Sequence, residues 1–98
     1  MSTRIVTVVD AAIAADREQE LLDGFKQINE QVKPAGLLGS ELLRGQNGAW
    51  RIQTLWQDKD ALLALRASGE PPAALALLDR LGAEHSHGLF TVEQSYDG

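Results

Sequence analysis

The residues of this chain that could do chemistry begin with two histidines near its end, His85 and His87. They stand two positions apart in a stretch predicted to be a strand, so both imidazoles share one face and could hold a metal ion together. No clear carboxylate or third histidine completes such a site, and we expect no metal. A single histidine beside a pocket could instead deprotonate a phenol as a general base. His85 is the candidate for that catalytic role.

Two tryptophans and one arginine are the other candidates. Trp50 and Trp56 lie on one face of a strand predicted over residues 49–56, but six residues of strand separate them by about 20 Å. They cannot both line one small pocket, so Trp50 is expected in the core or in a dimer contact. Arg66 could steady an anionic oxygen at a pocket mouth as a catalytic residue, although solvent exposure is the simpler expectation.

Composition excludes several classes of protein. The 98 residues predict one domain over 1–98, and the absence of cysteine excludes disulfides, thiolate catalysis, Cys-ligated zinc and iron–sulfur clusters. A net charge of −5 with no basic stripe argues against nucleic acid or an anionic membrane as partner. No apolar run approaches the roughly 20 residues that span a bilayer, and the N-terminus lacks the features of a signal peptide. We therefore expect a cytoplasmic protein.

Periodicity predicts four strands and three helices in the order β-α-β-β-α-β, with the second helical region interrupted by a proline pair. Asn47-Gly48 predicts a hairpin turn, and Asp58 can cap the helix that follows the third strand. Asp16 with Gln19 resembles a capping box for the first helix. The predicted strands are 4–9, 37–44, 49–56 and 84–95, and the predicted helices are 16–33, 58–67 and 73–81.

Two glycines have predicted structural roles. Gly24 lies inside the first helix, where it costs about 1 kcal/mol relative to alanine, and is expected to permit close packing on the sheet. Gly39 inside the second strand predicts a β-bulge or a close backbone approach.

The order of elements predicts an α+β, ferredoxin-like fold: a four-stranded antiparallel sheet with the helices on one face. Yet apolar residues fall on both faces of the strands, as in the neighbouring pair Leu55 and Trp56. An apolar face of this size left open to water would favour aggregation. A second copy is the simplest cover, so we predict a homodimer in which two sheets form a barrel.

Three stretches resemble the antibiotic biosynthesis monooxygenase (ABM) family of the dimeric α+β barrel superfamily. Residues 34–43 (PAGLLGSELL) resemble its loop and second strand, and residues 50–62 resemble its third strand, tryptophan and second helix. Residues 82–84 leading into 90–93 resemble its final strand. The resemblance implies a dimer of ferredoxin-like units, each with a pocket between its own sheet and helices. It places Trp56 at the family's pocket tryptophan, where the ring could stack on a flat aromatic substrate and the indole N–H could donate; core packing is the alternative.

Two departures from the family bear on function. The members that oxidise polyketides carry an asparagine four residues before this tryptophan, where this chain has Ile52. Gln53 points to the opposite face and does not replace it. Haem-degrading members use a histidine in the second helical region, and residues 58–81 contain none.

The first hypothesis is a cofactor-independent monooxygenase that oxidises a small electron-rich aromatic, such as a quinol or anthrone, with O₂. Its substrate-binding pocket would be lined by Phe25, Trp56 and Leu62, and no cofactor would be needed because the substrate provides the electrons. The alternative is a non-catalytic dimeric module that binds a hydrophobic small molecule, which the missing asparagine favours. A haem-binding protein is a third hypothesis, ranked last.

Overall fold

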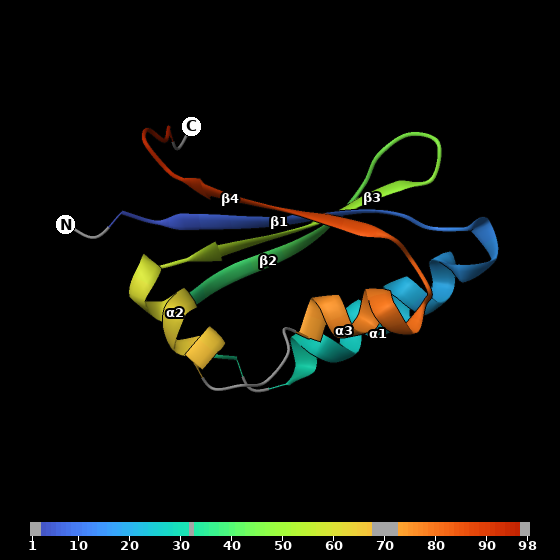
Figure 1. Cartoon of the computed structure of the whole chain (residues 1–98), viewed down its shortest axis with the longest axis horizontal. Helices are drawn as coiled ribbons and strands as arrows, with labels where there is room; N and C mark the ends of the chain where they lie inside the picture. Colours follow the sequence, from blue (N-terminus) through green and yellow to red (C-terminus); the bar gives the residue numbers. More distant parts are fainter. Residues whose placement is uncertain (1–2, 32, 68–72, 97–98) are drawn as a thin grey trace.

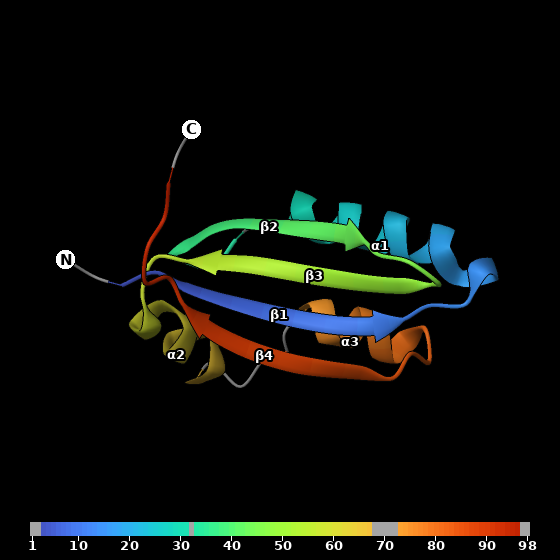
Figure 2. The same cartoon turned by 90° about the horizontal axis from the view of Figure 1, so that it is seen from above.

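The computed structural model describes residues 3–31, 33–67 and 73–96. Four antiparallel strands form one sheet in the order β2-β3-β1-β4, which Figure 2 shows face-on. The ferredoxin-like α+β fold predicted from the sequence is confirmed. The elements are β1 (Ile5–Ala12), the 3₁₀ turn η1 (Ala15–Arg17), α1 (Glu18–Glu30), β2 (Leu37–Arg44), β3 (Ala49–Trp56), α2 (Lys59–Ala67), α3 (Ala73–Arg80) and β4 (His85–Thr91).

The helices all lie on one side of the sheet, and no described helix or strand covers the other side (Figure 1). Alternation along each strand decides which residues meet the helices. On β3 these are Trp50, Ile52, Thr54 and Trp56, and the first, second and fourth are buried. In the described part of the chain, no helix is long and apolar enough to span a membrane.

Local sequence explains the hairpin, the second helix and the bulge. Asn47 and Gly48 both adopt positive φ, 56° and 80°, which is the backbone that an Asn-Gly turn supplies. The Asp58 carboxylate accepts the backbone N–H of Ala61 at 2.9 Å, so the predicted cap of α2 is confirmed. The register of β2 against β3 shifts between Leu37 and Gly39, which confirms the predicted bulge.

The entry into α1 differs from the prediction. Strand β1 continues to Ala12, and a 3₁₀ turn precedes α1, which begins at Glu18 rather than at Asp16. No side chain caps this end, and the amide of Gln19 donates to Asp23 within the helix instead of closing a capping box. The prediction was wrong because Asp16 falls inside the 3₁₀ turn, so its carboxylate does not stand at the N-cap.

The core lies between the sheet and the helices and has two clusters. The larger joins Trp50 and Ile52 to Leu21 of α1 and Leu78 of α3, and the smaller contains Ile5, Trp56 and Leu62. Contact between α1 and α3 depends on Gly24. A Cβ there would lie 2.4 Å from Cδ1 of Leu77, so the glycine serves the packing of α1 on α3. The prediction that it serves packing on the sheet was wrong, because the nearest atoms belong to α3.

The face of the sheet away from the helices is partly apolar. Phe90 is 58% exposed there and Leu43 is 39% exposed. The Phe90 ring lies over Gly88, whose Cβ, if it had one, would meet the ring at 2.9 Å. Beside these side chains, Arg51 donates two hydrogen bonds to Asp10, at 2.7 and 3.1 Å, and this bonding lowers the pKa of Asp10. We call this side of the sheet the open face.

Candidate functional site

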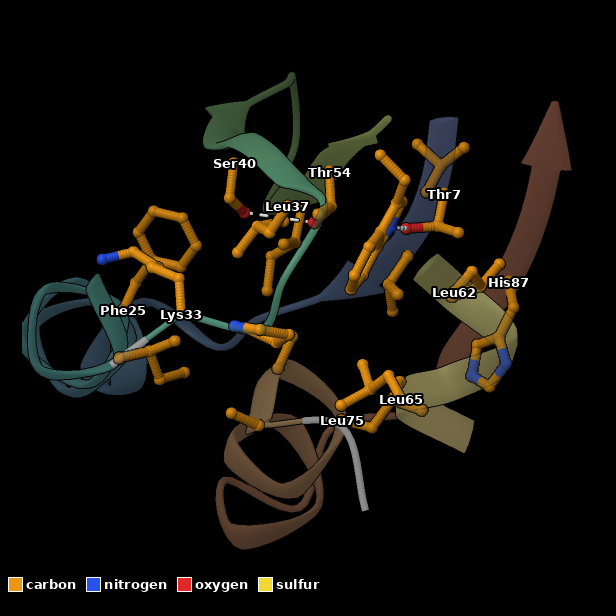
Figure 3. Close-up of a pocket in the computed structure, with 18 of the residues that line it drawn as sticks. Thr7, Phe25, Lys33, Leu37, Ser40, Thr54, Leu62, Leu65, Leu75 and His87 are labelled. Carbon is orange, nitrogen blue, oxygen red and sulfur yellow. Dashed lines mark hydrogen bonds between the residues drawn. The ribbon is translucent and has the colours of Figure 1, made fainter. Parts of the chain in front are cut away.

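A cavity of about 300 Å³ lies between the helix-facing side of the sheet and the three helices. This volume is at the lower end of the range for small-molecule pockets, about 300–1,000 Å³. Figure 3 shows Phe25 on one side of the cavity, His87 on the other, and Leu75 of α3 opposite the sheet. Most of its lining is apolar, so an apolar or aromatic ligand suits it better than a highly charged one.

The sheet contributes a row of three hydroxyl groups to the cavity wall. Ser40 of β2 pairs with Thr54 of β3, and Thr54 pairs with Thr7 of β1, so the three side chains lie side by side on the helix-facing side. The hydroxyls of Ser40 and Thr54 are hydrogen-bonded at 3.1 Å (Figure 3). A hydroxyl both donates and accepts, so this row can bind a carbonyl oxygen or an oxyanion of a ligand.

Trp56 lines the cavity next to this row and is 4% exposed. Its indole N–H donates to the hydroxyl oxygen of Thr7 at 3.1 Å. The indole N–H is therefore occupied by the protein and is not presented free to a ligand. The Thr7 hydroxyl accepts this bond at its oxygen, so its own O–H is not used in it, and Thr7 lines the cavity.

The other residues expected to bind substrate also reach the cavity. Phe25 of α1 and Leu62 of α2 both line it, as does Ile52. Two cationic side chains, Lys33 and Arg66, line it as well and are exposed, which places them at the mouth. Lys33 donates to the backbone carbonyls of Asn29 and Gln31 at the end of α1, whereas Arg66 has no ion-pair partner among the described residues.

The two histidines occupy different places. His87 lines the cavity, whereas His85 lies beside the cavity lining and not in it. The rings are stacked with centroids 4.9 Å apart, and Nδ1 of His85 is 2.9 Å from Nε2 of His87. On its other side, Nε2 of His85 is 2.9 Å from a carboxylate oxygen of Asp79. Among the described residues, no group of three His, Cys, Asp or Glu side chains is placed to hold a metal ion.

Trp50 belongs to the core. It is 4% exposed, its indole N–H donates to Glu18 at 3.1 Å, and the Arg44 guanidinium lies 4.4 Å from the centre of its ring. The pair of tryptophans is thus divided as the strand length predicted. Only Trp56 reaches the cavity, and Trp50 fixes the start of α1 to β3.

Sequence reasoning missed the hydroxyl row and favoured His85 over His87. Ser, Thr and His are common surface residues, and nothing in the order of the chain joins Thr7 to Ser40. The alternation Ile52, Thr54, Trp56 on one strand face was the only available signal, because it places a hydroxyl between two residues of the predicted pocket.

Fold and cavity together define an α+β protein with a ligand-sized site between its sheet and its helices. The family model described as antibiotic biosynthesis monooxygenase matches residues 4–77. That match covers most of the chain, so the protein belongs to the antibiotic biosynthesis monooxygenase family, as the resemblance had indicated. No significant match occurs among curated protein sequences.

Solved structures from different organisms share the fold. A variant of SnoaB, a cofactor-independent oxygenase from Streptomyces nogalater, is 22% identical with a TM-score of 0.72, over 94% of this chain and 95% of that one. A heme-degrading protein from Mycobacterium tuberculosis is 24% identical with a TM-score of 0.74, over the whole of both chains. A conserved protein from Methanosarcina mazei is 16% identical with a TM-score of 0.69, over 90% and 91%. At these identities the likeness establishes the fold, and function must come from the site.

Proposed function

We propose that the protein is a cofactor-independent monooxygenase that oxidises a small electron-rich aromatic, of the quinol or anthrone type, with O₂ in this cavity. The observation that carries the proposal is the hydroxyl row on the wall of an apolar cavity, next to the ring of Trp56. An aromatic substrate needs an apolar space, and its carbonyl or phenolate oxygen needs hydrogen-bond donors. The cavity supplies both, and membership of the family supports the chemistry.

The reaction balances with the substrate as the source of electrons. A base removes a proton from a phenolic O–H of the substrate, which for an anthrone is the O–H of its hydroxyanthracene tautomer. The resulting anion carries charge on carbon as well as on oxygen and transfers one electron to O₂. The radical and superoxide combine into a C–O bond, and the hydroperoxide then loses water to leave a C=O group. One oxygen atom enters the product and the other leaves as water, so no further reductant is required.

The protein's contribution is to favour the anion. Negative charge delocalised onto the substrate oxygen is stabilised by donors already in place, of which Thr7 is oriented by Trp56. Arg66 at the mouth adds positive charge without an ion-pair partner among the described residues. The apolar remainder of the cavity keeps water from competing for these donors. Together they replace the asparagine that the polyketide-oxidising members use and that is Ile52 here.

The test is O₂ consumption by the pure protein with a panel of reduced polycyclic quinols and anthrones. Thr7→Val removes the hydroxyl at constant shape, and Thr7→Ser is the matched control because it keeps the hydroxyl and loses only a methyl group. Removing one preorganised oxyanion donor costs about a hundredfold or more in turnover. We expect that loss in the valine variant and not in the serine variant. Equal rates in both would remove Thr7 from the mechanism.

A second candidate is a module that binds a hydrophobic small molecule without turning it over. Ile52 favours it, because an apolar side chain lines the cavity where the oxidising members have an amide. Binding of flat aromatic ligands can be followed by quenching of tryptophan fluorescence, since Trp56 lines the cavity and Trp50 does not. Comparing this binding with O₂ uptake separates the binding module from the monooxygenase. Saturable quenching without O₂ uptake above autoxidation would decide for binding alone.

We also propose that two copies pair through the open face. Phe90 and Leu43 are exposed there, and a chain of this size gains stability by burying such a surface. Sedimentation of Phe90→Glu at micromolar concentration tests it, with Leu63→Glu as control because Leu63 is 45% exposed on α2, on the other side of the sheet. We expect monomers for the first variant and dimers for the control. A monomeric wild-type protein would refute the pairing.

A further inference from the structure

Three side chains form a hydrogen-bonded chain that ends at the rim of the cavity. Asp79 on α3 is 71% exposed, His85 on β4 is 18% exposed, and His87 on β4 lines the cavity and is itself exposed. The two links are each 2.9 Å long. The carboxylate and the two imidazoles come from elements that are adjacent only because α3 returns the chain to the edge strand β4 (Figure 2).

When both imidazoles are neutral, the acceptor character of the carboxylate fixes every proton along this chain. Ionised Asp79 can only accept, so His85 carries its proton on Nε2 and donates it. Nδ1 of His85 is then a lone pair that accepts, so His87 must carry its proton on Nε2. The remaining ring nitrogen, Nδ1 of His87, is left as a lone pair with no hydrogen-bond partner among the described residues. One tautomer of each ring satisfies the whole chain.

We propose that His87 is the general base of the site, and that His85 and Asp79 are positioning residues that hold it in the tautomer able to accept a proton at Nδ1. This inference rests on the proposed function, because it names the group that makes the substrate anion. A phenolic O–H of the ligand breaks and an N–H bond forms at Nδ1. The resulting imidazolium keeps its Nε2–H donated to His85, so no link of the chain is lost.

The sheet register places His87 close to the hydroxyl row of Thr7, Thr54 and Ser40. His87 pairs with Val9 on β1, two residues from Thr7, so His87 and Thr7 are diagonal neighbours on the helix-facing side. Such neighbours lie roughly 7–8 Å apart along the sheet. An oxygen held by the Thr7 hydroxyl is therefore near the imidazole that would take its proton, and the two groups can act on one aromatic ring.

Charged side chains lie on two sides of His87. The cationic side chains that line the same cavity are Lys33 and Arg66, and both are exposed. The carboxylate of Asp79 is linked to His87 only through His85. An anion made by the base therefore forms in the cavity that these two cations also line.

The first measurement is the tautomer of each ring in the full chain, from two-bond ¹H–¹⁵N correlation spectra above the pH of imidazole titration. We expect His87 and His85 both to carry the proton on Nε2. His85→Phe keeps an aromatic ring but breaks both links, so His87 should become a mixture of tautomers. His85→Gln should restore the Nε2–H form, because an amide can donate to Asp79 and accept from His87. A proton on Nδ1 of His87 in the wild-type protein would overturn the inference.

The second measurement uses 1-hydroxyanthraquinone as the probe, because its phenolate absorbs at longer wavelength and the compound is already oxidised. We expect the bound phenol to ionise about one pH unit lower in the wild-type protein than in His87→Gln, and nearly as low in Asp79→Asn. Ionisation at the same pH in the wild-type protein and in His87→Gln would refute the base. Ionisation that depends on His87, with no O₂ uptake on any quinol or anthrone, would refute the oxygenase and leave the base standing.

Discussion

The hydrogen bond between Trp56 and Thr7 can be tested by a double-mutant cycle. The indole N–H donates to Thr7 at 3.1 Å from a side chain that is 4% exposed. Thr7→Val keeps the shape of the side chain and removes the acceptor. Trp56→Phe keeps an aromatic ring and removes the donor. The cycle therefore separates the bond from the packing of the two side chains.

The expected magnitudes follow from burial. Thr7→Val alone leaves a buried N–H without an acceptor, which costs about 1–3 kcal/mol of unfolding free energy. In the Trp56→Phe background there is no N–H to strand, so the same substitution costs close to nothing. The coupling between the two sites is then about 1–2 kcal/mol. For a domain of this size, each kcal/mol corresponds to a change in Tm of about 4–8 °C.

The assay is urea unfolding of the wild-type protein, both single variants and the double variant at one protein concentration, so that any dimerisation affects all four equally. Equal m-values are required, because a changed slope would signal a changed unfolded or native state. If the two single effects add to within about 0.5 kcal/mol, the side chains are uncoupled. Thr7 would then have no orienting partner, and its role as the oriented donor would be refuted.

Three further predictions concern packing, capping and pH. Gly24→Ala should lower the free energy of unfolding by about 1–3 kcal/mol, because its Cβ would meet Leu77 at 2.4 Å; unchanged thermal melting would show that the helices separate at little cost. Asp58→Ala should cost about 1 kcal/mol by urea unfolding, and Asp58→Asn much less, since an amide still caps α2. The pKa of Asp10 is lowered from its ordinary 3.8 by the hydrogen bond from Arg51, so its stabilising effect is complete above that value and disappears as the pH falls through the lower folded-state value. Asp10→Asn should therefore flatten the acid side of the stability profile and leave its dependence on pH near neutrality unchanged; identical acid profiles would exclude this pair from acid unfolding.

Much of the fold could be predicted because its signals are local. Alternation in residues 49–56, the Asn47-Gly48 turn and the Asp58 cap each depend on a few neighbouring residues, and the structure contains all three. The start of α1 was predicted wrongly because two local structures were possible there. Asp16 could either cap the helix or lie within a 3₁₀ turn, and the structure, in which β1 extends to Ala12, has the turn.

Less of the candidate site could be predicted, because it is made of contacts between strands. Trp56, Phe25 and Leu62 were named from the family resemblance, and all three line the cavity. Thr7 and Ser40 were not named, since their relation to Trp56 exists only when β1 and β2 pair with β3 in one particular register.

The sequence by itself determined the order of the elements, the side of the third strand that faces the helices, and the exclusion of cysteine chemistry. Only the tertiary structure decided that His87 rather than His85 reaches the cavity, and that the Trp56 N–H is already used. The physical reason is the range of the interactions. Periodicity and turn geometry act over a few residues, whereas a cavity wall joins side chains up to 80 positions apart, such as Thr7 and His87, through the sheet register that the whole fold imposes.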